Sequence, residues 1–395
     1  MATAGSFGVG FQPQAVILFM TTLAADGFGA PLGFGMGFGV SATSRRAVAH
    51  ASDDNALTAN AGRSASTTKI LQIPANGTPS LDAEADLVSL DADGFTVNWT
   101  TAPAIAYVVH YVALAGLENV AIGTLTEATG GGNQAVTGLG FQPNFLLFMS
   151  DGLTADDTTS TRIQFGLGAA AAGGTRGATC VFSEDGSVGS ETSMYQRSDR
   201  CIVSVVGDAG TVDAEADIVS FDSGGFTVNW TVTPVAADKV YFLAIRGGEF
   251  VVGAETQATS AGRKLTTGLP WQPGGLLAFG TNRAASASSA AGHKLSLGAA
   301  DTLGDGGVWE EDVDALGLTD ANVSTVRGKV LRHATSPSTI DADAELAEFT
   351  SDGYTLNWPT ADGTAREFIY LAALVEELVW RRIEPLVRLA AVWRS

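Results

Sequence analysis

Three copies of one short pattern decide the fold, and the first copy is Gly94-Phe95-Thr96-Val97-Asn98-Trp99. Its aromatic and branched side chains point to one face of an extended chain, whereas its threonine and asparagine side chains point to the other. A period of two residues with large side chains on one face predicts a half-buried β-strand. The pattern returns at residues 225–230 and 353–358, so each copy should contain an equivalent strand.

Two further markers recur in the same order before this strand, with small variations in the third copy. The first is a Gly-Phe-Gln-Pro segment, and the second is an acidic segment, Asp-Ala-Glu-Ala-Asp. They occupy residues 10–13, 140–143 and 270–273, and residues 82–86, 213–217 and 341–345. Successive copies of the last proline of the first marker lie 130 residues apart. This period is that of a whole domain, because solenoid repeats run to roughly 20–50 residues.

The chain therefore divides into tandem domains. The repeats are assigned to residues 1–129, 130–260 and 261–384, and a tail follows at residues 385–395. Repeated strands separated by Gly, Asn and Asp turns, with hardly any helical period, predict an all-β chain of three antiparallel β-sandwiches or jelly rolls. Because the linkers are short, we expect the copies to pack against one another or around a pseudo-symmetry axis.

Two details of the repeat predict local structure. Trp99, Trp230 and Trp358 end the patterned strand and are predicted to be equivalent core residues. In the acidic segment the alternation changes phase after Asp86, where Val88 takes the face that carried the carboxylates. A change of phase within one strand predicts a β-bulge or a bend.

Composition restricts the classes of function. The 395 residues carry a formal net charge of −20, and charged residues make up 16% of them, against about 25% in ordinary soluble proteins. Helix bundles and coiled coils need more Glu, Lys, Arg and Leu than this, so they are excluded. Nucleic acid is not an expected partner, because phosphate binding needs clustered Lys and Arg.

No membrane insertion, signal peptide or disulfide framework is expected. The longest apolar run, residues 104–117, is interrupted by His110 and falls short of the roughly 18–20 residues that span a bilayer. The first residues contain no basic region followed by an apolar segment, which argues against a signal peptide. Two cysteines cannot form a disulfide framework, and Cys180 and Cys201 are expected to form a cross-strand contact or to be two buried thiols.

Recognisable catalytic motifs are missing, so we predict no enzyme, no catalytic residue and no cofactor. The sequence contains no Gly-x-Ser-x-Gly, His-Glu-x-x-His or Gly-Lys-Ser/Thr motif. The stretch at residues 33–39 superficially suggests a nucleotide-binding loop, but its alternation of Gly with Phe and Met favours a strand that another backbone approaches closely. The histidines occupy different places in the repeat, and each is interpreted as incidental. They are His50, His110, His293 and His333.

The acidic segment is the charged feature that all three copies keep. Asp82, Glu84 and Asp86 lie two residues apart and therefore project from one face of a strand. This pattern is typical of a solvated edge that blocks sheet-to-sheet aggregation, and also of a Ca²⁺ site with clustered carboxylates. The carboxylates of the following turn are not repeated, so we predict that Asp82, Asp213 and Asp341 bind no structural metal. They should lie at solvated or inter-domain positions.

The end of the third copy differs from the ends of the other two. Residues 378–383 correspond to residues 250–255 of the second copy, and a unique tail follows. Tryptophan and arginine are concentrated there, and both are enriched at protein interfaces. The candidate assembly interface consists of Trp380, Arg381, Arg382, Arg388, Trp393 and Arg394. Closure of the third domain's core is the alternative role for this segment.

The order of the markers resembles that of a known class of proteins. Gly-Phe-x-Pro, an apolar strand, an acidic stretch and Gly-Phe-Thr-Val-Asn-Trp together resemble domains of tailed-bacteriophage virion proteins. Such domains occur in tail fibres, spikes and head-decorating proteins. The Phe-x-x-Pro segment and the late Gly-Phe strand are also similar to H-type lectin domains, although no sugar-binding residues can be identified.

The resemblance implies a non-enzymatic structural protein of a phage virion, displayed in multiple copies on the head or the tail. Its partners would be other copies of itself and neighbouring virion proteins. The alternative is a carbohydrate- or receptor-binding module of a tail fibre or spike, with a glycan of the host surface as its partner. A shallow aromatic site with polar neighbours in each copy would favour this alternative. A glycan hydrolase would instead need two carboxylates that converge in a cleft.

Overall fold

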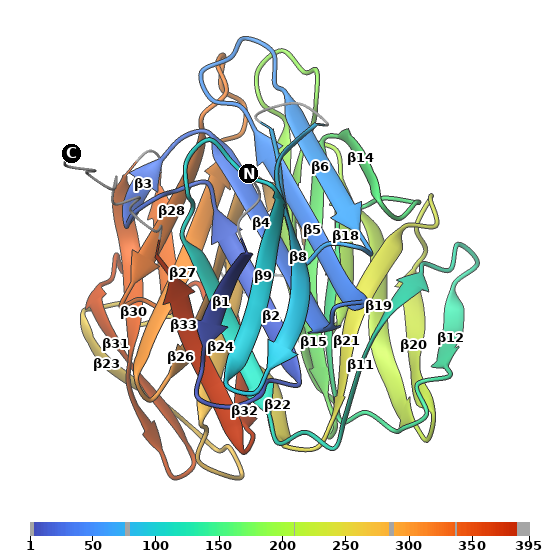
Figure 1. Cartoon of the computed structure of the whole chain (residues 1–395). Coiled ribbons are helices and arrows are strands. Elements are labelled where there is room, and N and C mark those ends of the chain that lie inside the picture. Colours follow the sequence, from blue (N-terminus) through green and yellow to red (C-terminus); the bar gives the residue numbers. More distant parts are fainter. Residues whose placement is uncertain (1–3, 76–79, 209, 284–287, 336–337, 385–395) are drawn as a thin grey trace, which may run out of the picture.

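β-Strands account for all the regular secondary structure of the described chain. The computed structural model describes residues 4–75, 80–208, 210–283, 288–335 and 338–384. These residues form thirty-three strands in six antiparallel sheets and contain no helix. Figure 1 shows the strands running the length of the molecule. The prediction of an all-β fold with antiparallel sandwich domains is confirmed.

Each repeat contributes eleven strands in the same order. The first has β1 (Ala4–Gly8), β2 (Ala15–Thr21), β3 (Gly27–Gly29), β4 (Leu32–Ser41), β5 (Ser44–Ser52), β6 (Ala61–Ser66), β7 (Leu71–Pro74), β8 (Leu81–Asp91), β9 (Gly94–Thr101), β10 (Val109–Ala115) and β11 (Asn119–Thr126). The second has β12 (Gly132–Thr137), β13 (Phe145–Ser150), β14 (Thr158–Thr161), β15 (Ile163–Ala171), β16 (Thr175–Ser183), β17 (Thr192–Arg197), β18 (Ile202–Val206), β19 (Thr211–Asp222), β20 (Gly225–Val232), β21 (Lys239–Arg246) and β22 (Glu249–Thr256). The third has β23 (Gly262–Thr267), β24 (Gly275–Arg283), β25 (Ala290–Ala291), β26 (His293–Asp301), β27 (Gly304–Asp312), β28 (Ala321–Arg327), β29 (Leu331–Thr335), β30 (Thr339–Thr350), β31 (Gly353–Thr360), β32 (Glu367–Leu374) and β33 (Glu377–Ile383).

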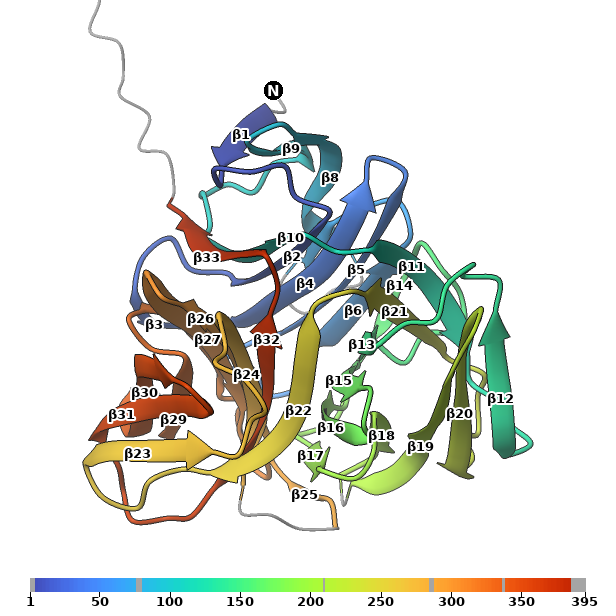
Figure 2. The same ribbon diagram turned by 90° about the horizontal axis from the view of Figure 1, so that it is seen from below.

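Three sandwiches surround a common centre, each made of one four-stranded and one seven-stranded sheet (Figure 2). The four-stranded sheets lie outermost, in the orders β1-β9-β8-β7, β12-β20-β19-β18 and β23-β31-β30-β29. The three tryptophans occupy the same position of β9, β20 and β31, as predicted. Trp230 and Trp358 are buried core residues, whereas Trp99 is only half-buried at the first core, so their predicted equivalence does not extend to burial. Strand β1 is described only from Ala4, which pairs with Asn98, next to Trp99.

Each seven-stranded sheet contains strands from all three repeats. The last strand of one repeat pairs with the next repeat, so that β11 joins β21, β22 joins β32, and β33 returns to β10 of the first repeat. Short strands cross in the opposite direction, where β14 joins β6, β25 joins β17, and β3 joins β28. The expected packing around a pseudo-symmetry axis is therefore accompanied by exchange of strands between repeats.

The seven-stranded sheets pack against one another as well as against their four-stranded partners. Phe34 of the first repeat, Phe165 of the second and Leu297 of the third belong to one buried cluster at the centre. A strand in such a sheet is covered on both faces, and all seven residues of β2 are accordingly buried. Burial on both faces explains why these strands have continuous rather than alternating apolar sequences.

Glycines let the two sheets of each sandwich approach closely. Phe34, Met36 and Phe38 of β4 belong to the central cluster, whereas the glycines between them face β7 of the four-stranded sheet. A Cβ atom on Gly37 would lie only 1.9 Å from the carbonyl oxygen of Ile70. The interpretation of residues 33–39 as a strand under a close backbone is confirmed.

The predicted bulge in the acidic strand is also confirmed. The register between β8 and β9 shifts between Leu87 and Ser89, so Val88 is the extra residue. The equivalent shifts follow Ile218 and Leu346 in the other two repeats. The bulge leaves Val88 exposed while Leu87 stays in the core, as a local change of strand phase requires.

We predict that Gly37→Ala destabilises the whole molecule. The added methyl group would overlap the Ile70 carbonyl, and overpacking of this kind typically costs about 1–3 kcal/mol. Gly317→Ala is the control, because a Cβ atom there meets no atom within 4 Å. Thermal unfolding followed by circular dichroism should show a lower Tm for Gly37→Ala only. Equal melting temperatures for both variants would contradict the close approach of the two backbones.

Candidate functional site

Strand β33 of the third repeat pairs with β10 of the first and so closes the three repeats into a ring. It contains three of the six residues proposed for assembly. Trp380 pairs with Val112 of β10 and is only 5% exposed. Its indole stacks on the imidazole of His110, with ring centroids 5.8 Å apart. The side chain lies over Gly306, where a Cβ atom would come within 2.4 Å of the indole ring. Trp380 therefore joins the third repeat to the first from inside the molecule.

The two arginines that follow are held by carboxylates of the same chain. Arg381 donates from Nη1 to Asp301 Oδ2 over 2.7 Å, and the backbone N–H of Trp380 donates to the same oxygen over 3.0 Å. Arg382 forms ion pairs with Asp26 of the first repeat and with Glu384. These contacts hold β33 in place between the third repeat and the first. Arg388, Trp393 and Arg394 lie outside the described residues.

A buried polar seam lies between the first and second repeats. Arg63 of β6 donates from Nη1 to Gln164 Oε1 of β15 over 3.1 Å. The backbone N–H of Ser64 donates to Asp151 Oδ2 over 3.0 Å. Burial lowers the pKa of the Arg63 guanidinium and raises that of the Asp151 carboxyl well above its usual range. The seam therefore joins the two repeats through polar side chains taken out of water.

Three acids lie close together beside this seam. Burial, together with the nearby charges of Asp238 and Asp213, raises the pKa of Glu127 to about 9. The pKa of Asp238 is also raised, mainly by burial. Glu127 Oε2 has no hydrogen-bond partner among the described residues. Glu127 is consequently protonated at neutral pH in the folded chain.

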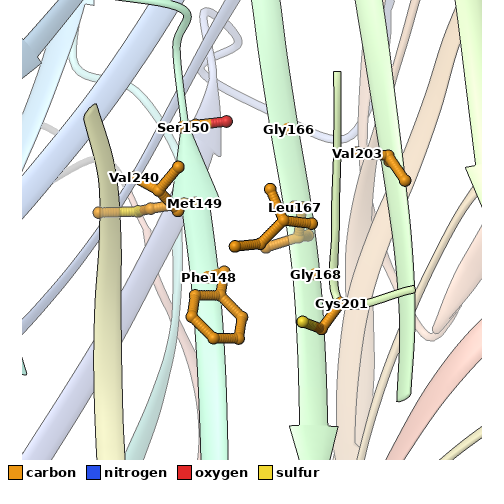
Figure 3. Close-up of a pocket in the computed structure, with 10 residues that line it drawn as sticks. Phe148, Met149, Ser150, Gly166, Leu167, Gly168, Cys201, Val203 and Val240 are labelled. Carbon is orange, nitrogen blue, oxygen red and sulfur yellow. The ribbon is translucent and has the colours of Figure 1, made fainter. Parts of the chain in front are cut away.

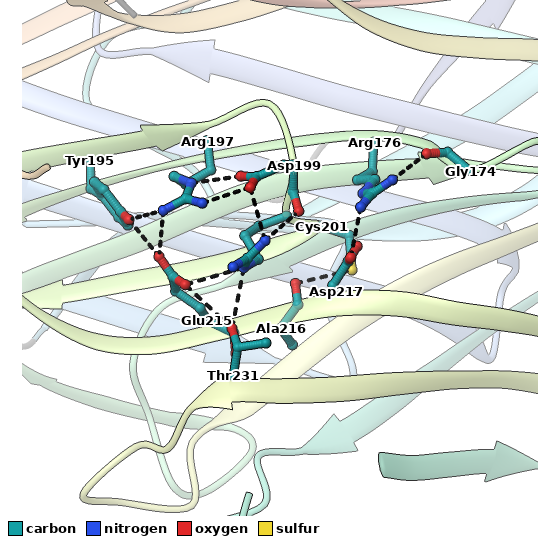
Figure 4. Close-up of polar contacts among 11 residues, drawn as sticks. Gly174, Arg176, Tyr195, Arg197, Asp199, Cys201, Glu215, Ala216, Asp217 and Thr231 are labelled. Carbon is teal, nitrogen blue, oxygen red and sulfur yellow. Dashed lines mark hydrogen bonds and ion pairs between the residues drawn. The ribbon is translucent and has the colours of Figure 1, made fainter. Parts of the chain in front are cut away.

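Basic side chains accompany the acidic ladders in all three repeats. In the second repeat, Asp217 pairs with Arg176 over 2.7 Å, and Glu215 pairs with Arg197 and Arg200 over 3.3 and 3.1 Å (Figure 4). The first repeat pairs Asp86 with Arg45 and Lys69, and the third pairs Asp343 with Arg332, Glu345 with Lys329, and Asp341 with Arg366. The ladders thus form ion-pair networks on β8, β19 and β30, which are inner strands of the four-stranded sheets. The expectation of a solvated edge is therefore wrong, and Asp213 is buried rather than solvated.

A second polar cluster, which sequence reasoning missed, lies where the repeats meet. His50 Nε2 and His293 Nε2 lie 3.0 and 3.2 Å from the same oxygen, Oε1 of Glu310. All three side chains are at most 1% exposed. Burial alone would raise the pKa of Glu310, but the adjacent imidazoles outweigh this effect and hold it at about 2. Each histidine was interpreted as incidental, yet these two converge on one carboxylate.

The equivalence of positions explains why the cluster was missed. His50, Val181 and Glu310 are the seventh residues of β5, β16 and β27, so the repeat places three different side chains at one position. His293 begins β26, where the first repeat has Leu32. Candidate residues that must recur in every repeat do not include these positions, because the residue type differs from one repeat to the next. The sequence signal was weak, because His50 interrupts the apolar run of residues 47–51 but Glu310 stands directly beside Glu311 and Asp312.

The remaining candidates are small or shallow. A cavity of about 10 Å³ in the second sandwich, lined by Phe148, Leu167 and Cys201 among others, has room for about one water molecule (Figure 3). A groove of about 290 Å³ lies between the first two repeats. The described residues that line it include no aromatic side chain; they are Ser66, Thr68, Gln72, Leu81, Glu84, Asp157, Thr158 and Thr159.

Both cysteines are free, buried thiols. Cys180 lies on β16, and Cys201 precedes β18. Burial raises the pKa of each thiol, which keeps both protonated at neutral pH. Of the two alternatives expected from the sequence, the structure contains buried thiols without a disulfide between them.

Comparison with known proteins found no family model, no curated protein and no solved structure that matches the chain. Among the described residues, no helix is long and apolar enough to cross a membrane.

We predict that Trp380→Ala opens the ring. Truncation of a buried tryptophan typically costs about 3–5 kcal/mol, and here the loss falls on the strand that joins the third repeat to the first. The bond between Arg381 and Arg382 should then become accessible to trypsin. Mass spectrometry of briefly digested protein should detect cleavage there in Trp380→Ala and little in the unmodified chain.

Trp271→Ala is the matched control, because Trp271 is a half-buried tryptophan of the third sandwich that packs away from β33. Cleavage between Arg381 and Arg382 should stay slow in this variant. Equal protection in Trp380→Ala would mean that the indole does not hold the strand.

We predict that Glu127→Gln removes a pH-dependent loss of stability. The folded-state pKa of Glu127, about 9, lies above its ordinary value of 4.5. The stability that this difference contributes is fully present below about pH 4.5, and the free energy of unfolding falls as pH rises from there through 9. A glutamine cannot ionise. The gain in Tm of Glu127→Gln over the unmodified chain should therefore be larger at pH 8.5 than at pH 5.

Glu118→Gln provides the control, since Glu118 is exposed and pairs with Arg246 at the surface. This variant should show no gain that grows with pH. A gain for Glu127→Gln of the same size at both pH values would contradict the burial of an uncharged carboxyl group.

Proposed function

We propose that the protein is a non-enzymatic structural component of a tailed-bacteriophage virion, present in multiple copies on the head or the tail. The observation that carries the proposal is that every seven-stranded sheet combines strands from all three repeats. The resemblance of the repeated markers to virion domains supports the same class of function. The chain is then a rigid module that other virion proteins display or contact.

A particle component must persist outside the cell for long periods, which makes the rate of unfolding the relevant property. Removing any one repeat would require breaking backbone ladders to both of the others. For the first repeat these are the ladders β10–β33 and β6–β14 in its own sheet, and β3–β28 and β11–β21 in the neighbouring sheets. Interlocked construction of this kind favours slow unfolding and so suits a structural role.

The docking role is proposed for the tail, residues 385–395. Trp380, Arg381 and Arg382 make contacts within the chain, so the remaining members of the proposed interface are Arg388, Trp393 and Arg394. Arginine supplies fork-shaped hydrogen bonds to carboxylates, and tryptophan fills apolar pockets. In a chain with a net charge of −20, a basic and aromatic end is suited to bind another copy or an acidic neighbour.

We predict that deleting residues 385–395 leaves the Tm unchanged but abolishes self-association or incorporation into particles. Light scattering on the purified chain measures the first, and quantitative mass spectrometry of particles assembled with the variant measures the second. Arg263→Glu is the control for lost positive charge, because Arg263 is exposed on the third repeat. Unchanged association and incorporation would remove the docking role from the tail.

Immunogold labelling of intact particles tests the proposed function itself. A regular array of label on the head or the tail is expected. Absence of the protein from purified particles would overturn the proposal. Label confined to fibre tips, together with binding of the purified chain to host-cell glycans, would instead support the adhesion alternative.

A further inference from the structure

Strands of all three repeats bring polar side chains to one buried point. His50 comes from β5 of the first repeat, His293 and Glu310 come from β26 and β27 of the third, and Ser183 comes from β16 of the second. Both Nε2 atoms lie within hydrogen-bond distance of Glu310 Oε1. The imidazole rings are 5.9 Å apart and inclined at 61°. The three ligand atoms that this arrangement offers lie within 4.8 Å of one another.

Contacts among the described residues leave this cluster incompletely satisfied. Glu310 Oε2 and His50 Nδ1 are buried and have no hydrogen-bond partner among the described residues. Buried polar atoms without a partner are costly, and a native structure normally contains few of them. The other side of the cluster is supported, because His293 Nδ1 lies 2.9 Å from Ser183 Oγ. A hydrogen bond to the distal nitrogen is the usual support of an imidazole that binds a metal through its other nitrogen.

We propose that His50 Nε2, His293 Nε2 and the Glu310 carboxylate bind a divalent transition metal ion, with Zn²⁺ as the best match. Two imidazoles and one carboxylate are ligands typical of zinc, whereas Ca²⁺ and Mg²⁺ prefer all-oxygen sites. Ligand atoms placed tetrahedrally at about 2.0–2.2 Å from zinc lie roughly 3.3–3.6 Å apart. The two observed separations between Nε2 and Oε1, 3.0 and 3.2 Å, thus need only a small expansion, and the two Nε2 atoms lie within 4.8 Å of each other. Binding through both carboxylate oxygens would also satisfy Glu310 Oε2.

The ion would serve structure rather than catalysis. The ligand side chains are at most 1% exposed, which leaves little access for a substrate. The ligands come from the first and third repeats, and Ser183 of the second repeat contacts one of them. The ion would therefore link the repeats where they meet at the centre of the molecule. The rival arrangement is a hydrogen-bonded His–Glu–His cluster without metal. The two differ in composition, and elemental analysis separates them.

The test is the metal content of the full-length chain, produced in medium supplemented with Zn²⁺ and, separately, with Co²⁺. About one equivalent per chain is expected in the unmodified protein and at least ten-fold less in Glu310→Gln, which keeps the side chain's size. His333→Gln is the matched control, because His333 is also buried but contacts Gln257 instead of the cluster. It should retain the full equivalent.

Two results would overturn the proposal. One is less than a tenth of an equivalent of metal in the unmodified chain from either medium, which would leave the hydrogen-bonded cluster. The other is full metal content in Glu310→Gln. If that variant does not fold, X-ray absorption and visible spectra of the Co²⁺-loaded unmodified chain decide the question. Two imidazole ligands and a carboxylate support the site, and any other ligand set contradicts it.

Discussion

The backbone ladder between β10 and β33 is the interaction on which the rest of the molecule depends. It pairs Val109–Ala115 of the first repeat with Glu377–Ile383 of the third and so turns a linear array into a closed ring. The other two junctions use the same pairing within the order of the chain, β11 with β21 and β22 with β32. Each seven-stranded sheet therefore contains one strand from each of the two repeats that do not supply its other strands. The exchanged strands are the two edge strands of each seven-stranded sheet, so the edges of each repeat's own strands are covered by its neighbours.

The closed ring explains the chemistry found at its centre. Large side chains at alternate positions of β4, such as Phe34 and Phe38, reach the common core because glycines on the other face admit the backbone of β7. A core shared by three similar but unequal copies can also hold side chains that only one or two copies supply. His50, His293 and Glu310 are such a set. Arg63 and Asp151 form another at the junction of the first two repeats, where burial shifts the pKa of both groups.

Local sequence patterns were sufficient to predict the strands and several of their details. Alternation predicted β9, the phase change at Val88 predicted the bulge, and the glycine-rich stretch predicted a close backbone. The partner of each repeat's last strand could not be predicted, because a strand pattern specifies which face is buried but not which edge is joined. For the same reason Trp380 could be assigned to docking, although it packs against His110 within the chain.

The central claim is that the three repeats form one interlocked unit. Its most direct test is to insert protease sites between Thr129 and Gly130 and between Ser260 and Ala261, both exposed linkers, and to cut the folded chain at both. The account predicts that the three fragments stay together in native mass spectrometry and separate only on denaturation, because each holds strands in the sheets of the others. Release of independently folded fragments of about 130 residues under native conditions would contradict it.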